Sequence, residues 1–182
     1  LSWVDNPLQQ LQRSINYVAE KFMRDPINLP IKPEVPPKRI KIGYISGDFY
    51  NFPTMHLLAG MLEAHNRERF EIYAFSYVLR KNDKMRQRIK LGVDHFIDVN
   101  DLSSNEIAKL IQSHNIDISI DLNGYTRKSR SEIFQYRMSP IQINYLGYPS
   151  TMGANFIDYI IADPVTIPDE NRDFYSEKII YM

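Results

Sequence analysis

Short apolar and β-branched runs recur along the chain and alternate with segments of helical periodicity. The runs predict β-strands, because each is short and is bounded by polar or turn-forming residues. They cover residues 39–46, 70–77, 95–99, 116–122, 141–146, 159–162 and 178–182. Segments with apolar residues three and four positions apart predict helices at residues 54–65, 83–91, 103–114 and 129–136. This alternation predicts βαβ units and a Rossmann-like α/β domain, with a mostly parallel sheet that is covered on both faces.

The helix at residues 103–114 carries the clearest start signal in the chain. Ser103 and Glu106 have the spacing of a capping box, and Leu102 and Ile107 have that of the accompanying hydrophobic staple. We therefore expect the helix to begin next to Ser103.

One amphipathic helix is expected before the βαβ units. Asn6 and Pro7 supply an N-cap and a first-turn proline, which predicts a helix over residues 7–23. Its apolar seam consists of Leu8, Leu11, Ile15, Val18 and Phe22. The prolines at positions 26, 30, 33, 36 and 37 then favour extended backbone. We assign residues 1–38 to an N-terminal helix and proline-rich linker, and residues 39–182 to the Rossmann-like domain.

The amino-acid composition limits the classes of function that the chain can have. The 182 residues include 22 Lys plus Arg and 22 Asp plus Glu, so no net charge favours a nucleic acid or an anionic membrane as partner. The absence of cysteine excludes disulfides and thiolate metal sites and fits a reducing compartment. No basic-then-apolar leader opens the chain, and no stretch approaches the roughly 18 apolar residues of a membrane helix. We expect a soluble, cytoplasmic protein.

Three segments that follow predicted strands are candidates for a binding site, because open parallel sheets bind ligands beyond the carboxyl ends of their strands. They are residues 47–56, 121–127 and 146–153. The first leads into a helix N-terminus, whose free N–H groups suit an anion or a sugar oxygen. In the second, Gly124 permits a tight turn. The third combines aromatic, glycine and hydroxyl residues, a mixture that suits a carbohydrate.

The same residues also fit a purely structural role. Asn123-Gly124 is an ordinary turn dipeptide, and Asp48 and Asp121 are ordinary capping residues. Gly43 and Gly47 do not complete a dinucleotide-binding motif, and the chain contains neither a P-loop nor an acidic metal cluster. Phosphate binding within this chain is therefore weakly supported, and a nicotinamide or flavin dehydrogenase is disfavoured.

The four histidines differ in their positions. His65 and His114 end predicted helices, where the helix dipole favours a cation, and both are expected at the surface. His95 opens a strand and is expected to be structural. His56 lies in the first turn of a helix above a strand end, which makes it the histidine best placed for general-base catalysis.

Five strings occur in a characteristic order along the chain. They are RIKIGYISGDF (39–49), HNRERFE (65–71), DISIDLNGYT (117–126), SPIQINYLGYP (139–149) and FIDYI (156–160). From about Arg39 to Met182, the chain resembles the start of the catalytic region of O-GlcNAc transferases of the SPINDLY type. The resemblance implies the N-terminal half of a GT-B glycosyltransferase, which moves a sugar, expected to be GlcNAc, from a UDP-sugar to Ser or Thr hydroxyls of proteins with inversion and without a metal.

The resemblance also implies partners and site residues. Tetratricopeptide repeats usually precede the catalytic region, and a C-terminal domain outside residues 1–182 carries most contacts to the nucleotide. The N-terminal domain covers the sugar and the acceptor. The implied substrate-binding residues are Asn51, Phe52, Pro53, Thr54, Asn123, Gly124, Tyr125, Thr126, Leu146, Gly147, Tyr148 and Pro149.

Two positions depart from the family pattern. Phe52 stands where the family commonly has histidine, and Ser150 stands where it commonly has glycine. Because Phe52 cannot accept a proton, either His56 or Asp48 takes the role of the catalytic base, or the acceptor proton leaves through water or the donor phosphate. A different reading stays open: a non-catalytic or degenerate module that binds sugar or peptide together with a separate partner chain.

Overall fold

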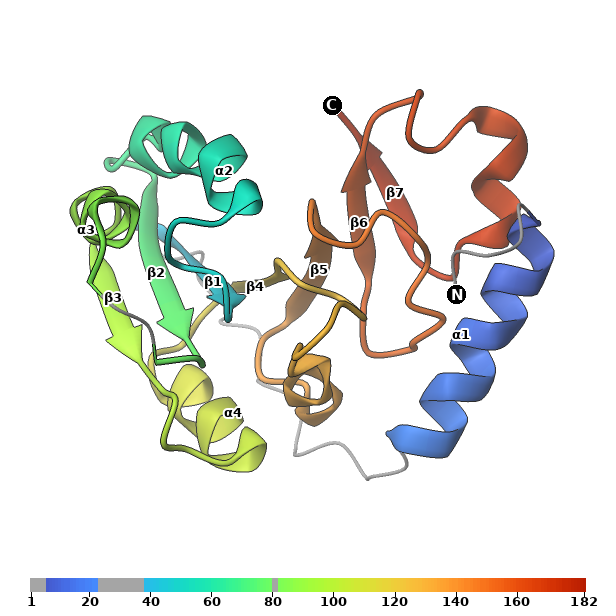
Figure 1. The fold of residues 1–182 in the computed structure, drawn as a ribbon, viewed down its shortest axis with the longest axis horizontal. Coiled ribbons are helices and arrows are strands. Elements are labelled where there is room, and N and C mark those ends of the chain that lie inside the picture. Colours follow the sequence, from blue (N-terminus) through green and yellow to red (C-terminus); the bar gives the residue numbers. More distant parts are fainter. Residues whose placement is uncertain (1–5, 23–37, 80–81) are drawn as a thin grey trace.

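A parallel β-sheet forms the centre of the computed structural model, which describes residues 6–22, 38–79 and 82–182 (Figure 1). All neighbouring strands pair in parallel, in the order β3-β2-β1-β4-β5-β6-β7. The strands are β1 Ile40–Ser46, β2 Phe70–Ser76, β3 His95–Asp98, β4 Ile118–Asp121, β5 Ile141–Tyr145, β6 Tyr159–Ala162 and β7 Lys178–Tyr181. All seven predicted strands are therefore confirmed, as is the Rossmann-like α/β class.

The predicted helices are present with small changes at their ends. They are α1 Pro7–Lys21, α2 Pro53–Ala64, α3 Lys84–Leu91 and α4 Ser104–Ser113. The capping box of Ser103 and Glu106 is formed. The segment predicted as a helix at 129–136 is a 3-10 helix, η1 Ser131–Tyr136, and a second one, η2 Asp169–Phe174, was not predicted. Residue 23 and the proline-rich linker up to residue 37 lie outside the described residues.

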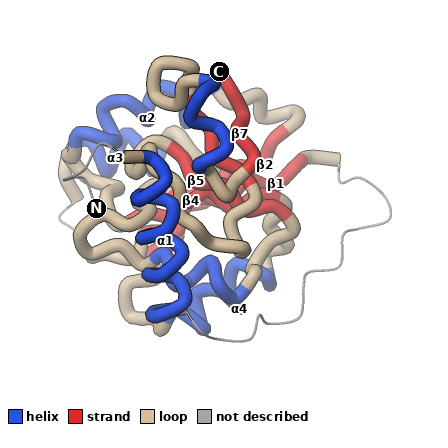
Figure 2. The backbone as a smooth tube through the Cα atoms, turned by 90° about the vertical axis from the view of Figure 1, so that its right-hand side faces the viewer, coloured by secondary structure: helices blue, strands red, loops and turns tan. Residues whose placement is uncertain are grey.

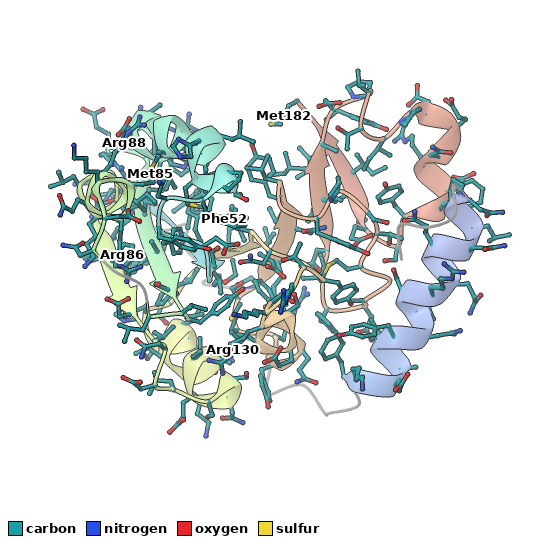
Figure 3. The ribbon with its side chains drawn as sticks, viewed as in Figure 1. Phe52, Met85, Arg86, Arg88, Arg130 and Met182 are labelled. Carbon is teal, nitrogen blue, oxygen red and sulfur yellow. The ribbon has the colours of Figure 1, made fainter. Side chains whose placement is uncertain are left out.

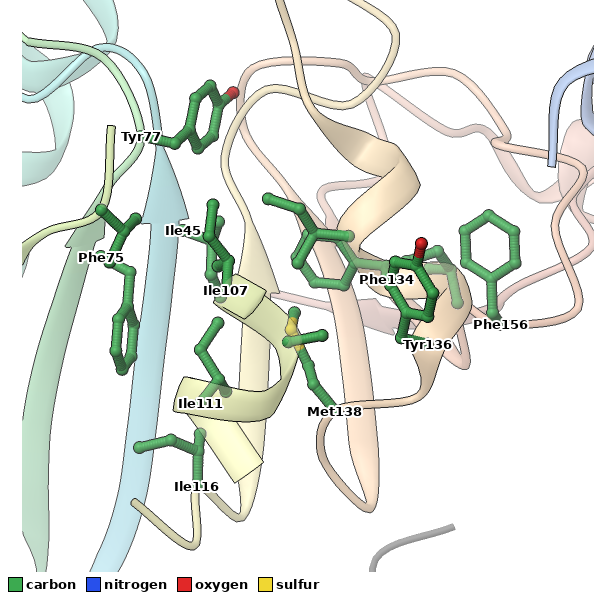
Figure 4. Packing of buried hydrophobic residues seen from close by; sticks show 14 of the residues in the cluster. Ile45, Phe75, Tyr77, Ile107, Ile111, Ile116, Phe134, Tyr136, Met138 and Phe156 are labelled. Atoms are coloured by element: carbon green, nitrogen blue, oxygen red, sulfur yellow. The ribbon is translucent and has the colours of Figure 1, made fainter. Parts of the chain in front are cut away.

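Two buried clusters cover the two faces of the sheet. On β1, Tyr44 belongs to one cluster and its neighbour Ile45 to the other, because successive side chains of a strand point to opposite faces. Helices α2 and α3 cover the first face, to which they contribute Leu58 and Ile89. Helix α4 and η1 cover the second face, where Ile107 packs among the aromatic and aliphatic side chains of Figure 4.

Helix α1 runs along the outside of the domain (Figure 2). Ser14 is its buried residue and donates a hydrogen bond to the carbonyl of Thr151 (2.9 Å). Val18 and Phe22 pack against the core, whereas Leu8 and Ile15 are 59% and 41% exposed. The predicted seam is thus only partly used, because the small Ser14 side chain brings the helix close to the domain and turns Leu8 and Ile15 outward. Among the described helices, none is long and apolar enough to cross a membrane.

Candidate functional site

A cleft of about 560 Å³ opens beyond the carboxyl ends of the central strands. All three segments singled out in the sequence contribute to it. Its lining residues are Gly47, Asp48, Tyr50, Phe52, Thr54, Val78, Leu122, Asn123, Thr126, Arg127, Lys128 and Gly147. The position agrees with the rule that parallel sheets bind ligands at this edge.

Asn123 forms the floor of the cleft and is almost completely buried. Its Oδ1 atom accepts hydrogen bonds from Ser46 Oγ (2.8 Å), Gly47 N (3.2 Å) and Tyr77 Oη (2.8 Å). Burial raises the pKa of Tyr77, so its hydroxyl stays a donor. Asn123 Nδ2 donates to Asp48 Oδ2 (2.5 Å). Because three donors converge on the oxygen, the amide has one orientation, and its nitrogen holds the carboxylate of Asp48 at the cleft.

Asp121 shapes the turn that carries Asn123. Its Oδ1 atom accepts from the backbone N–H groups of Asn123 (2.9 Å) and Gly124 (3.0 Å), and Ser131 Oγ lies 2.8 Å from its Oδ2 atom. Burial raises the pKa of Asp121, while these hydrogen bonds favour its charged form. Asp121 is thus a buried turn residue, which is the structural role that its sequence left open.

Two glycines allow the second and third segments to interlock. A Cβ atom on Gly147 would lie 2.0 Å from the carbonyl oxygen of Leu122, and one on Gly124 would lie 2.4 Å from Tyr148 Cβ. Gly124 also has a φ of +52°, a backbone conformation that disfavours side chains. The two segments pack backbone against backbone, so glycine is required at both positions.

Aromatic side chains form part of the cleft wall. The rings of Tyr50 and Phe52 lie 5.4 Å apart at 40°, and both line the cleft. Phe52 is the N-cap residue of α2 and makes no side-chain capping bond. Pro53 follows it as the first helical residue, and Thr54 lines the cleft. The N-terminus of α2 therefore adjoins the cleft, as its sequence predicted.

The predicted site residues fall into two groups. Those that line the cleft are Asp48, Phe52, Thr54, Asn123, Thr126 and Gly147. Those that are not among its lining residues are Asn51, Pro53, His56, Gly124, Tyr125, Leu146, Tyr148 and Pro149. The Tyr125 hydroxyl donates a hydrogen bond to the Met152 carbonyl (2.8 Å), and its ring packs against the ring of Tyr17 on α1. Tyr125 therefore contacts the third segment without lining the cleft. Direct substrate contacts stay a prediction for both groups.

His56 lies on the exposed side of the first turn of α2, with its Nε2 atom 2.7 Å from Asn51 Oδ1. Two other histidines differ from expectation. His65 is partly buried and bonded to the Tyr44 hydroxyl (2.8 Å), and burial lowers the pKa values of both His65 and His114. At these helix ends, loss of hydration outweighs the favourable dipole that the sequence suggested. His95 pairs with Glu71 at 2.8 Å.

Six lining residues were not predicted individually: Gly47, Tyr50, Val78, Leu122, Arg127 and Lys128. Most of them belong to the predicted segments, but a loop has no periodicity that tells which side chain faces a cleft. Arg127 and Lys128 are exposed and give this edge of the cleft a positive charge. Among the described residues, no group of three or more metal-ligating side chains occurs.

Comparison with known proteins identifies the family of the chain. The family model described as glycosyl transferase family 41 matches residues 15–182. The chain is 43% identical over 187 aligned positions to the probable UDP-N-acetylglucosamine–peptide N-acetylglucosaminyltransferase SEC of Arabidopsis thaliana, covering 97% of this chain and 19% of that protein. It is 40% identical to the UDP-N-acetylglucosamine–peptide N-acetylglucosaminyltransferase of Caenorhabditis elegans, covering 80% of this chain and 13% of that protein.

A solved structure has the same fold over the whole chain. It is an O-GlcNAc transferase variant from Thermobaculum terrenum, with a TM-score of 0.90 and 26% identity, covering 100% of this chain and 35% of that one. The chain thus spans less than a fifth of the length of the two curated relatives above. The family match and the cleft at the predicted sheet edge lead to one conclusion: the chain belongs to glycosyl transferase family 41.

Proposed function

We propose that this chain forms the acceptor-facing half of the catalytic cleft in a protein O-GlcNAc transferase. The observation that supports this proposal most directly is the cleft: three segments of a family 41 chain converge at the carboxyl edge of a parallel sheet around a polar floor. The names of the relatives support UDP-N-acetylglucosamine as donor and a peptide as acceptor. The complete site also needs a second GT-B domain, and upstream tetratricopeptide repeats and a cytoplasmic location are part of the proposal.

The chemical task of this half is to orient an acceptor hydroxyl, remove its proton and exclude water. Asp48 is the cleft's carboxylate, and no histidine is among the described residues that line it. The Asn123 amide fixes that carboxylate at 2.5 Å, whereas His56 is bonded to Asn51 outside the lining. The geometry therefore favours Asp48 over His56 as the proton acceptor.

The remaining lining groups fit the same task. Thr54 and Thr126 place hydroxyls at the cleft, and the rings of Tyr50 and Phe52 form an apolar wall. An apolar wall lowers the local dielectric constant and excludes water, which limits hydrolysis of the donor. Phe52 supplies this surface at the position where the family commonly places a histidine. The proposed mechanism uses no metal.

Kinetics of the full-length enzyme test the assignment. With UDP-GlcNAc and an acceptor peptide, Asp48→Asn should lower kcat by about 10²–10⁴-fold, the usual contribution of a general base. His56→Ala serves as the comparison and should have a smaller effect. Normal turnover in Asp48→Asn would remove Asp48 as the base. A wild-type enzyme that binds peptide but neither transfers nor hydrolyses the donor would favour the non-catalytic module instead.

A further inference from the structure

The wall of the cleft is anchored from a helix that does not line it. Helix α3 packs beside α2, and none of its residues is among the cleft lining. The segment between β1 and α2 carries Tyr50 and Phe52 into the cleft. Two side chains at the start of α3, Asp83 and Arg86, bind the backbone of this segment. They hold it at two successive points.

Asp83 joins the helix and the segment through its two carboxylate oxygens. Oδ1 accepts the backbone N–H of Arg86 (2.8 Å) and thereby caps α3. Oδ2 accepts the backbone N–H of Asn51 (2.8 Å), which lies between the two aromatic wall residues. The amides of Arg86 and then Asn51 lower the pKa of Asp83, which agrees with a charged, doubly bonded carboxylate.

Arg86 binds the same segment through a backbone carbonyl. It is 2% exposed, and its Nη1 atom donates to the carbonyl of Phe49 (3.0 Å) and to Ser76 Oγ (3.2 Å). Its Nη2 atom is paired with Asp98, and its guanidinium lies 4.7 Å from the centre of the Phe96 ring. One buried cation thus joins the segment to the ends of β2 and β3. Because a buried arginine is costly to desolvate, apolar packing would serve stability alone at least as well.

We propose that Asp83 and Arg86 are positioning residues, which set the place of Tyr50 and Phe52 in the cleft and so tune sugar transfer without touching the substrates. This inference rests on the proposed function for its catalytic consequence. The structural part, a fixed segment 49–52, stands on the contacts of Asp83 and Arg86.

Asp83→Asn separates positioning from folding. Asparagine is as good an N-cap as aspartate, so α3 should still form. The N–H groups of Arg86 and Asn51 bind different oxygens of Asp83, and in asparagine one of these oxygens is replaced by an NH2 group, which cannot accept, so one of the two contacts is lost. Arg86→Lys is the second variant, because it keeps the charge but replaces the planar two-nitrogen fork, which bonds the Phe49 carbonyl and Asp98, with a single ammonium group. Arg88→Ala is the matched control, because Arg88 lies on the same helix as Arg86 (Figure 3). Arg88 is exposed and pairs with Glu63 of α2 (2.7 Å) instead of the segment.

Hydrogen exchange and kinetics of the full-length enzyme form the test. In Asp83→Asn, the amides of residues 49–52 should exchange about tenfold faster, as expected for loss of a hydrogen bond to a charged acceptor. Turnover with UDP-GlcNAc and peptide should fall by about tenfold, mainly in kcat, with an unchanged melting temperature. Arg88→Ala should match the wild type in all three measurements.

Three results would overturn the positioning role: unchanged exchange at residues 49–52 in Asp83→Asn, faster exchange with normal kcat, or equal effects in Arg88→Ala. A wild-type enzyme without transferase activity would refute the proposed function instead, and the exchange comparison would still decide whether Asp83 holds the segment. If Arg86→Lys fails to fold, Asp83→Asn alone gives the answer.

Discussion

Replacing Asn123 by aspartate tests the polar floor of the cleft. The two side chains have the same shape, so Oδ1 can keep its three donors from Ser46, Gly47 and Tyr77. The other atom changes from an N–H donor to a carboxylate oxygen that faces Asp48 Oδ2 across 2.5 Å. Two negative charges about 4 Å apart repel by roughly 4 kcal/mol at an effective dielectric constant of 20. Because Asp48 is partly exposed, solvent screening reduces this to about 2 kcal/mol.

This repulsion gives the effect a definite pH dependence. Two adjacent carboxylates share a proton, which raises the pKa of the pair in the folded state above its value in the unfolded chain. The folded state then binds more protons than the unfolded state once the pH exceeds about 4, so stability falls as the pH rises through the raised pKa. Urea denaturation should show Asn123→Asp to be about 2 kcal/mol less stable than the wild type at pH 8, with a smaller difference at pH 5.

The reversed pair is the control. Combining Asp48→Asn with Asn123→Asp restores one amide and one carboxylate, so most of the stability at pH 8 should return. Turnover should stay low in this double variant, because the carboxylate has moved from the cleft position to the floor. Equal stability of Asn123→Asp and wild type at pH 8, or an equal loss at pH 5 and pH 8, would refute the network described for Asn123.

Three further predictions concern the rest of the chain. Gly153→Ala should destabilise the protein by more than about 1 kcal/mol in thermal melting, because Gly153 has a φ of +61° and an added Cβ would lie 2.6 Å from the Ile15 backbone nitrogen of α1. Leu8→Ala on the same helix is the control: Leu8 is exposed, so this change should alter the stability by less than about 0.5 kcal/mol. Burial lowers the pKa of His65 below 6.5, so the free energy of unfolding is retained above that pH and declines as the pH falls below it. In urea denaturation, His65→Gln should therefore lessen the decline between about pH 7 and 5. A slope equal to that of the wild type would contradict a lowered pKa of His65. Calorimetric titration of UDP into the 182-residue chain should give a Kd no tighter than about 1 mM, and micromolar binding would contradict the proposed division between the two GT-B domains.

The fold could be predicted because its signals are local and repeated. Each strand has a short apolar run, and the capping box of Ser103 and Glu106 marks the start of α4. The helix η2 Asp169–Phe174 was missed because it has no buried residue and hence no apolar period. The contact face of α1 depends on Ser14 meeting Gly153 from far along the chain, which no pattern within the helix reveals.

The site could be predicted as a place, but only partly as a set of side chains. Strand order puts the three segments at one edge of the sheet, and that information is present in the alternation of elements. Which side chain of a loop faces the cleft depends on how the loops interlock. Gly147 lies against Leu122 and reaches the lining, whereas the neighbouring Tyr148 is turned onto Gly124 and Tyr125.

The supports of the cleft also do not depend on the side chain at position 52, where the resemblance implies a histidine and this chain has Phe52. Its segment is held by backbone contacts, since Asp83 binds the N–H of Asn51 and Arg86 binds the carbonyl of Phe49, and neither contact depends on the side chain at position 52. The carboxylate of Asp48 is held separately by Asn123. A change at position 52 therefore alters the chemistry of the wall while its place stays fixed, and the proposed proton acceptor, Asp48, is held independently of that position.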